Sequence, residues 1–89
     1  MAVLLVTYDL KQPGRDYLPI YDYLKRFTWC HHLESVWLID TSLSTTQVRD
    51  ALTRLVDSND VIFVAKLTRD WASYNYGCAG WLNDAARIW

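Results

Sequence analysis

The sequence predicts a single α+β domain in which the elements follow the order strand, helix, strand, strand, helix, strand. Short apolar runs rich in strand-forming residues occur at 3–9 and 61–67, as expected of buried strands. Two segments, 16–27 and 44–56, carry apolar residues at helical spacing. The chain has 89 residues, of which 52% are hydrophobic, so it fits one folded domain over residues 1–89 and is too apolar for a disordered protein.

The first strand, Val3–Asp9, is an apolar stretch that ends in a carboxylate. Such a run is typical of a central strand that is buried on both faces. Pro13 and Gly14 stop the strand, so Asp9 is expected at the lip of a loop. Loops held by a rigid scaffold often carry chemistry. Asp9 is therefore the leading candidate for a functional residue, and the alternative is that it caps the loop.

The first helix is expected over Asp16–Phe27. Asp16 is a suitable N-cap, and Pro19 falls in the first turn, where a missing N–H costs little. Thr28–Asp40 then has the composition of extended chain and is long for one strand. We expect a hairpin or a bulge near residues 33–35 to divide this segment into two strands.

The second helix has the clearest start in the chain, because Ser44 and Gln47 form a capping-box pattern. Its apolar stripe comprises Val48, Ala51, Leu52, Leu55 and Val56. Val61–Leu67 is expected to be the last strand. The remaining tail is rich in Trp, and Gly80–Trp89 is expected to form a short amphipathic helix.

This βαββαβ order is that of a ferredoxin-like sandwich with a C-terminal Trp-rich tail or short helix. Right-handed crossovers would place both helices on one face of the sheet. The first and last strands, however, carry apolar side chains on both faces. The second face therefore needs a cover, either the tail or a second copy of the chain. We expect a homodimer in which sheet faces or edges meet around a two-fold axis.

Charge and cysteine content limit the partners and the compartment. The chain has 9 basic and 10 acidic residues and a net charge of −1, which argues against binding nucleic acid by bulk charge alone. Cys30 and Cys78 form no CxxC pair, and two free thiols fit a reducing cytoplasm. No apolar run approaches the length of a membrane span. We expect a soluble, cytoplasmic protein without a membrane partner.

Asp9 is also the candidate metal ligand. Carboxylate oxygens are hard ligands that suit Mg²⁺ or Mn²⁺. A single carboxylate is a poor site, but in a two-fold dimer Asp9 and its symmetry mate can share one ion. His31 and His32 are adjacent and would point to opposite faces of a strand, so they are not expected to chelate an ion within one chain.

Other side chains could contact nucleic acid. Arg15 and Arg69 could hold phosphate oxygens in a forked geometry, or could pair with neighbouring aspartates instead. Five aromatic residues could stack on bases or, as we favour, belong to the core or an interface: Trp29, Trp37, Trp71, Tyr74 and Tyr76.

Several short segments, taken in order, resemble those of a known family. They are Val6–Leu10, a strand that ends in Tyr-Asp; Phe27–Trp29 with Ser35–Trp37, similar to a Trp-x-Gln-x-Ser-Val-Phe segment; Leu43–Thr45; and Asp60–Val64. Across residues 3–67 their order and spacing resemble the CRISPR-associated protein 2 family. VapD-like toxins share the same architecture. In the region of the family's glutamine this chain has His31, His32 and Leu33.

The resemblance implies a ferredoxin-like homodimer with metal-dependent endonuclease activity on RNA or DNA. By position, Asp9 would be the metal-binding and catalytic aspartate at the dimer axis, and Ser35 the serine of the second motif. Bound Mg²⁺ or Mn²⁺ would polarise the scissile phosphate and lower the pKa of water. The candidate substrate-binding residues are Tyr8, Lys11, Arg15 and Arg69.

Two alternatives to this nuclease stay open. One is a non-catalytic dimer that binds nucleic acid or bridges integrase subunits during spacer acquisition in CRISPR antiviral defence. The other is a VapD-like toxin ribonuclease. In the first alternative Asp9 is structural, and the aromatic tail is the docking surface.

Overall fold

The computed structural model describes residues 1–11 and 17–89, which form a small α+β fold with one four-stranded antiparallel sheet and three helices. The α+β class predicted from the sequence is confirmed. The strand order across the sheet is β2-β3-β1-β4. The elements, in chain order, are β1 (Ala2–Asp9), α1 (Leu18–Leu24), β2 (Thr28–Leu33), β3 (Val36–Thr41), α2 (Thr45–Thr53), β4 (Val61–Lys66) and α3 (Ala79–Asn83).

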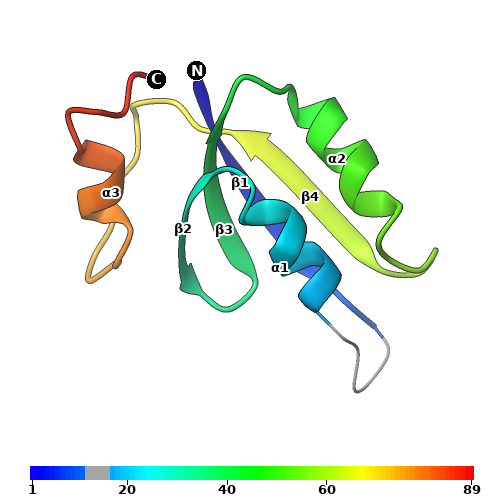
Figure 1. The fold of residues 1–89 in the computed structure, drawn as a ribbon. Helices are drawn as coiled ribbons and strands as arrows, with labels where there is room; N and C mark the ends of the chain where they lie inside the picture. Colours follow the sequence, from blue (N-terminus) through cyan, green and yellow to red (C-terminus); the bar gives the residue numbers. More distant parts are fainter. Residues whose placement is uncertain (12–16) are drawn as a thin grey trace.

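Strand β1 lies at the centre, hydrogen-bonded to β3 along one edge and to β4 along the other. The predicted central strand is therefore confirmed. Its side chains alternate between the two faces of the sheet. Leu4 and Val6 pack under α1 and α2, whereas Val3 faces the opposite side. Figure 1 shows α1 and α2 together over one face, with α3 apart from them.

Helix α1 is shorter than the periodicity predicts. It spans Leu18–Leu24 rather than Asp16–Phe27, with Pro19 in its first turn as expected. The proposed cap, Asp16, lies outside the described residues. At the other end, Thr28 already pairs with Asp40 in the sheet, so the chain must leave the helix early enough to turn back. Competition from sheet pairing therefore ends this helix.

Two local predictions are confirmed. The segment 28–40 forms two strands, with a turn at Glu34–Ser35 and a register shift between His31 and Leu33. The capping box also forms. The Ser44 backbone N–H donates to Gln47 Oε1 at 2.9 Å, and the Gln47 backbone N–H donates to Ser44 Oγ at 3.1 Å.

The tail helix was placed correctly in part. Helix α3 covers Ala79–Asn83 rather than Gly80–Trp89. Asp84 has an extended backbone at the helix end, and its Oδ1 accepts a hydrogen bond from the Ala86 N–H at 2.9 Å. Aspartate competes with the helix for backbone donors in this way, which ends the helical run.

Two hydrophobic layers lie on opposite faces of the sheet. The first joins β1 and β3 to α1 and α2 and contains Leu4, Val6, Tyr8, Leu10, Ile20, Leu24, Trp37, Ile39, Val48 and Leu52. The second joins Val3 and Leu38 to Cys78 and Leu82 of the tail. The expectation that the second face needs a cover is therefore borne out, and the tail supplies one. The homodimer remains a prediction.

The tail is held by a disulfide between Cys30 and Cys78. This corrects the expectation of two free thiols. The residues are 48 positions apart, and their Cα atoms lie 5.9 Å from each other. Cys30 pairs with Leu38 in the sheet, and both face the tail. The fold thus brings together two cysteines that the sequence spacing could not connect.

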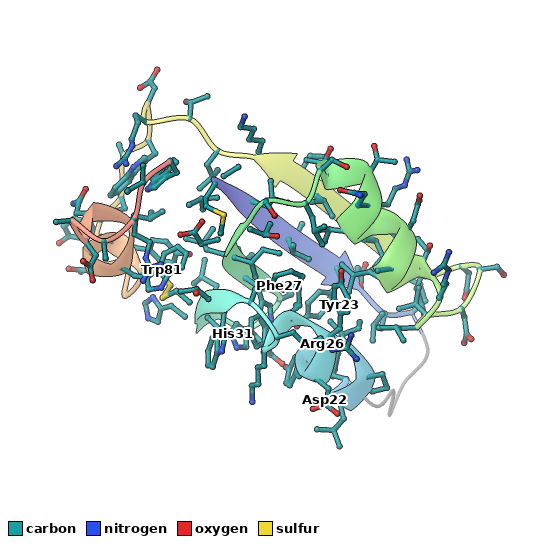
Figure 2. The ribbon with its side chains drawn as sticks, turned by 45° about the horizontal axis from the view of Figure 1, so that its top comes forward. Asp22, Tyr23, Arg26, Phe27, His31 and Trp81 are labelled. Carbon is teal, nitrogen blue, oxygen red and sulfur yellow. A yellow bond between two sulfur atoms is a disulfide. The ribbon has the colours of Figure 1, made fainter. Side chains whose placement is uncertain are left out.

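Further polar contacts fix the tail on the sheet. The Arg87 guanidinium forms an ion pair with Asp40 at 3.3 Å and lies over the Trp81 ring. On the edge strand β2, His32 Nδ1 accepts a hydrogen bond from the Gly77 N–H at 2.7 Å. In Figure 2, His31 lies next to α1, whereas Trp81 lies with α3. Within the described residues, none of the helices is long and apolar enough to cross a bilayer.

A Cys30→Ser, Cys78→Ser double variant should lose stability, mainly because the cross-link no longer restricts the unfolded chain. Closing a loop of this length, 48 residues in sequence, stabilises a protein by about 4 kcal/mol in the chain-entropy model. We expect the free energy of unfolding in urea to fall by up to this amount. Wild-type protein treated with reductant is the control and should behave like the variant. Equal stability of the oxidised wild type and the variant would contradict the disulfide.

Candidate functional site

A hollow of about 360 Å³ lies at the carboxyl end of β1. It brings together three residues that the sequence singled out: Tyr8, Asp9 and Ser35. The sheet register explains why. Thr7 pairs with Val36, so the turn residues before Val36 lie beside the end of β1. The full lining is Thr7, Tyr8, Asp9, Tyr17, Tyr21, Glu34 and Ser35.

Asp9 lies at the rim of this hollow with 64% of its side chain exposed. Its Oδ2 accepts a charge-assisted hydrogen bond from Lys11 Nζ at 2.6 Å. Exposed ion pairs of this kind contribute about 0–1 kcal/mol, so a metal ion or a phosphate can replace either partner at little cost. The Lys11 backbone N–H donates to Asp60 Oδ1 at 2.9 Å, which ties the lysine backbone to the loop before β4.

Tyr8 forms the floor of the hollow, and its side chain is buried. Its hydroxyl donates to the Glu34 carbonyl at 3.3 Å and accepts from Trp37 Nε1–H at 3.1 Å. Burial raises the pKa of the Tyr8 phenol further above its ordinary value, and the neutral phenol is the form that donates to the Glu34 carbonyl. The structure thus places this predicted substrate-binding residue where its hydroxyl links β1 to the turn that carries Ser35.

Histidine 31 supports the same turn from the other strand. Its Nε2–H donates to the Glu34 carbonyl at 2.8 Å, and its ring stacks on Trp37 at 4.0 Å between centroids. Tyr21 of α1 packs against both rings. The sequence does not predict this role of His31, because the hydrogen bond depends on how the hairpin turn folds back onto β2. Its neighbour His32 faces the tail, as strand alternation predicts.

The remaining candidates are distributed differently. Ser35 is exposed in the turn of the β2–β3 hairpin. Arg15 lies outside the described residues. Arg69 belongs to the tail, where its guanidinium donates to the Trp89 and Arg87 carbonyls and lies 4.2 Å from the Trp89 ring. The structure therefore joins Asp9, Lys11, Tyr8 and Ser35, but does not bring Arg69 into the lining of the hollow.

The donor set for a metal ion at this hollow is small. Within the part of the chain that the structure describes, no three or more His, Cys, Asp or Glu side chains gather where they could hold an ion. Mg²⁺ commonly uses only one or two protein carboxylates and takes its other ligands from water and substrate phosphates. An exposed carboxylate such as Asp9 is suited to this mode of Mg²⁺ binding, above all if a second copy of the chain supplies a second carboxylate.

The chain matches no model of a known protein family, and no solved structure matches it. Its function is therefore to be inferred from the chemistry of the hollow and of the surfaces around it.

Proposed function

We propose that the chain is a metal-dependent endonuclease of the CRISPR-associated protein 2 type, which acts on RNA or DNA as a homodimer. The observation that carries this proposal is the meeting of Asp9 and Ser35 in one open hollow. The two residues are far apart in sequence and come from different strands and turns. A carboxylate, a hydroxyl and the Lys11 ammonium at one rim suit the binding of a phosphodiester.

The connections of the sheet support the ferredoxin-like part of the proposal. Strand β3 lies between β1 and β2, and it is antiparallel to both. Strands β1 and β2 are therefore parallel to each other, and α1 connects them. In the same way, β1 lies between β3 and β4, which α2 connects. Two such interleaved βαβ units are what a ferredoxin-like sandwich requires.

Each residue of the hollow has a part in the proposed reaction. Asp9 would hold Mg²⁺ or Mn²⁺ through its carboxylate, and Lys11 would move from Asp9 to a phosphate oxygen. Ser35 would donate a hydrogen bond to the phosphate from the hairpin turn. Tyr8 would keep that turn in place. When bound, the metal ion supplies Lewis-acid polarisation of the scissile phosphate and lowers the pKa of water.

An uncovered apolar strip supports the homodimer. Val61 and Phe63 of β4 are 47% and 57% exposed, and in the register they lie opposite Asp9 and Thr7. Because strand side chains alternate, they share the face of the sheet that the tail covers elsewhere. A second copy related by a two-fold axis would bury this strip. It would also bring the two Asp9 carboxylates close to each other.

A second candidate function is a non-catalytic dimer that binds nucleic acid and a protein partner such as an integrase subunit. The Lys11 ammonium at the rim of the hollow, 2.6 Å from Asp9 Oδ2, favours it, since this cation can bind a phosphate without a metal ion. In this case the hollow binds a phosphate through Lys11 without cleaving it.

Replacing Asp9 with asparagine should separate the two functions. The loss of a metal-binding carboxylate removes several kcal/mol of transition-state stabilisation, so we expect cleavage of RNA or DNA with Mg²⁺ or Mn²⁺ to fall by at least about 100-fold. Asp22→Asn is the matched control, because Asp22 is exposed on α1 and is not among the residues that line the hollow. Equal cleavage by wild type and Asp9→Asn would exclude Asp9 from catalysis.

The oligomeric state tests the apolar strip. We expect wild-type protein to have the mass of two chains by light scattering, and Phe63→Glu to shift it toward one chain, because a charge in a buried contact is costly. Ile88→Glu should leave the mass unchanged, since Ile88 is equally apolar and 78% exposed but lies in the tail. A wild-type monomer at high micromolar concentration would contradict the dimer.

We also propose a cytoplasmic location, where nucleic-acid substrates are found. Because the cytoplasm keeps thiols reduced, the Cys30–Cys78 disulfide would then form only under oxidising conditions. Maleimide added while cells are lysed in denaturant should label both cysteines, including Cys78, which is buried in the folded chain, and treatment of the cells with an oxidant beforehand should prevent this. A disulfide that is already complete in untreated cells would point to an oxidising compartment instead.

A further inference from the structure

A second hollow, of about 460 Å³, lies between the sheet and the tail segment 71–76. Its floor includes Leu5 and Leu38 of the sheet, and its aromatic wall consists of Trp71, Tyr74 and Tyr76. Among the described residues that line it, none is charged. Its volume falls in the range of sites that bind small molecules, and such sites are mainly apolar with a few polar groups. The chemistry of the wall thus favours an uncharged, flat, aromatic ligand.

The few polar groups of this hollow can bind the edge of such a ligand. His32 Nδ1 accepts the Gly77 N–H, so in the neutral ring the proton is on Nε2, which is a donor. Ser73 and Asn75 add a hydroxyl and an amide to the lining. An amide offers both donors and acceptors. Aromatic faces together with mixed donors and acceptors are the complement of a nucleobase.

The two hollows are neighbours on the β2–β3 hairpin. Leu33 and Val36 line the second hollow, whereas the turn residues between them, Glu34 and Ser35, line the first. On β1, Leu5 belongs to the second hollow and Asp9 to the first. These two positions are four steps apart along the strand, or about 13 Å. One short strand of nucleic acid can therefore reach both hollows at once.

We propose that the second hollow is a nucleobase-binding pocket and that it selects single-stranded nucleic acid. The proposal rests on the proposed function, in which the hollow at Asp9 holds the phosphate. A base would stack on Trp71 and Tyr76, with Tyr74, which is 89% exposed, closing the rim. A base in a duplex is paired and stacked, so it enters such a pocket only if it is first extruded at an energetic cost. Unpaired strands avoid this cost.

When the Cys30–Cys78 disulfide is formed, the pocket is built before any ligand binds. The segment that carries its aromatic wall is followed directly by Gly77 and by the disulfide at Cys78. A Cβ added at Gly77 would lie 2.9 Å from His32 Cγ, so the close approach of the tail to β2 depends on glycine. Binding therefore needs little ordering of the tail, which favours affinity.

Binding of fluorescent ten-nucleotide strands, followed by anisotropy with the disulfide intact, tests the pocket. The protein carries Asp9→Asn and no divalent metal is added, so cleavage does not interfere. We expect a single strand to bind at least tenfold more tightly than a duplex. We expect an abasic strand of the same length, which keeps the phosphates, to bind at least fivefold more weakly than the normal strand.

Two substitutions test whether the preference for a strand with bases arises in this pocket. Trp71→Leu removes the stacking surface, and Tyr74→Ala removes an exposed ring whose loss does not threaten folding. Each should weaken binding of the normal strand at least about fivefold and leave binding of the abasic strand unchanged. Trp29→Leu is the matched control, because Trp29 lies on β2 and lines neither hollow.

Equal affinity for normal and abasic strands, or full affinity of Tyr74→Ala, would overturn the base pocket. A preference for duplex would also overturn it. These outcomes are independent of the proposed nuclease, since Asp9 is already replaced. If the single strand binds as expected while the wild type cleaves nothing with Mg²⁺ or Mn²⁺, the pocket stands and the nuclease does not.

Discussion

The burial of β1 on both faces is the constraint on which the rest of the fold depends. This strand is hydrogen-bonded along both edges and carries apolar side chains toward both sides, so each face must be removed from water. Helices α1 and α2 cover one face. The tail covers the other near Val3 and Leu38, but leaves Val61 and Phe63 of β4 largely exposed. The incomplete cover creates both the apolar strip proposed for dimerisation and the hollow beside the tail.

Only a few buried apolar residues hold the tail on the sheet, and a disulfide and an ion pair add to their contribution. The disulfide joins it to β2, and the Arg87–Asp40 ion pair joins it to β3. Asp40 Oδ1 is buried and has no hydrogen-bond partner within residues 1–11 and 17–89, which reduces the net gain from this pair. Stacking of Arg87 over Trp81 at 4.3 Å restores part of it. A segment held by a few such contacts is where local opening is expected to begin.

The features predicted well from the sequence depend on near neighbours. The capping box at Ser44 and the central strand ending at Asp9 are each predicted by residues that are adjacent or only a few positions apart in the sequence. The end of α1 was wrong because periodicity does not register the competing pairing of Thr28 with Asp40. The Cys30–Cys78 disulfide was missed because it joins positions 48 apart. Asp9 is predicted from its place at the end of the first strand and Ser35 only from the family resemblance, and the sheet register brings the two residues into one hollow.

Residues of the β2–β3 hairpin line both hollows, and hydrogen bonds to its turn fix their positions. The Glu34 carbonyl in its turn accepts hydrogen bonds from both the Tyr8 hydroxyl and the His31 ring. These contacts hold Ser35 beside Asp9, and the same turn sets the position of Leu33 in the other hollow. Alternation along β2 directs His31 toward α1 and His32 toward the tail, so two adjacent histidines supply a support for the first hollow and a polar group for the second. The shape of both hollows therefore depends on how this one turn is held.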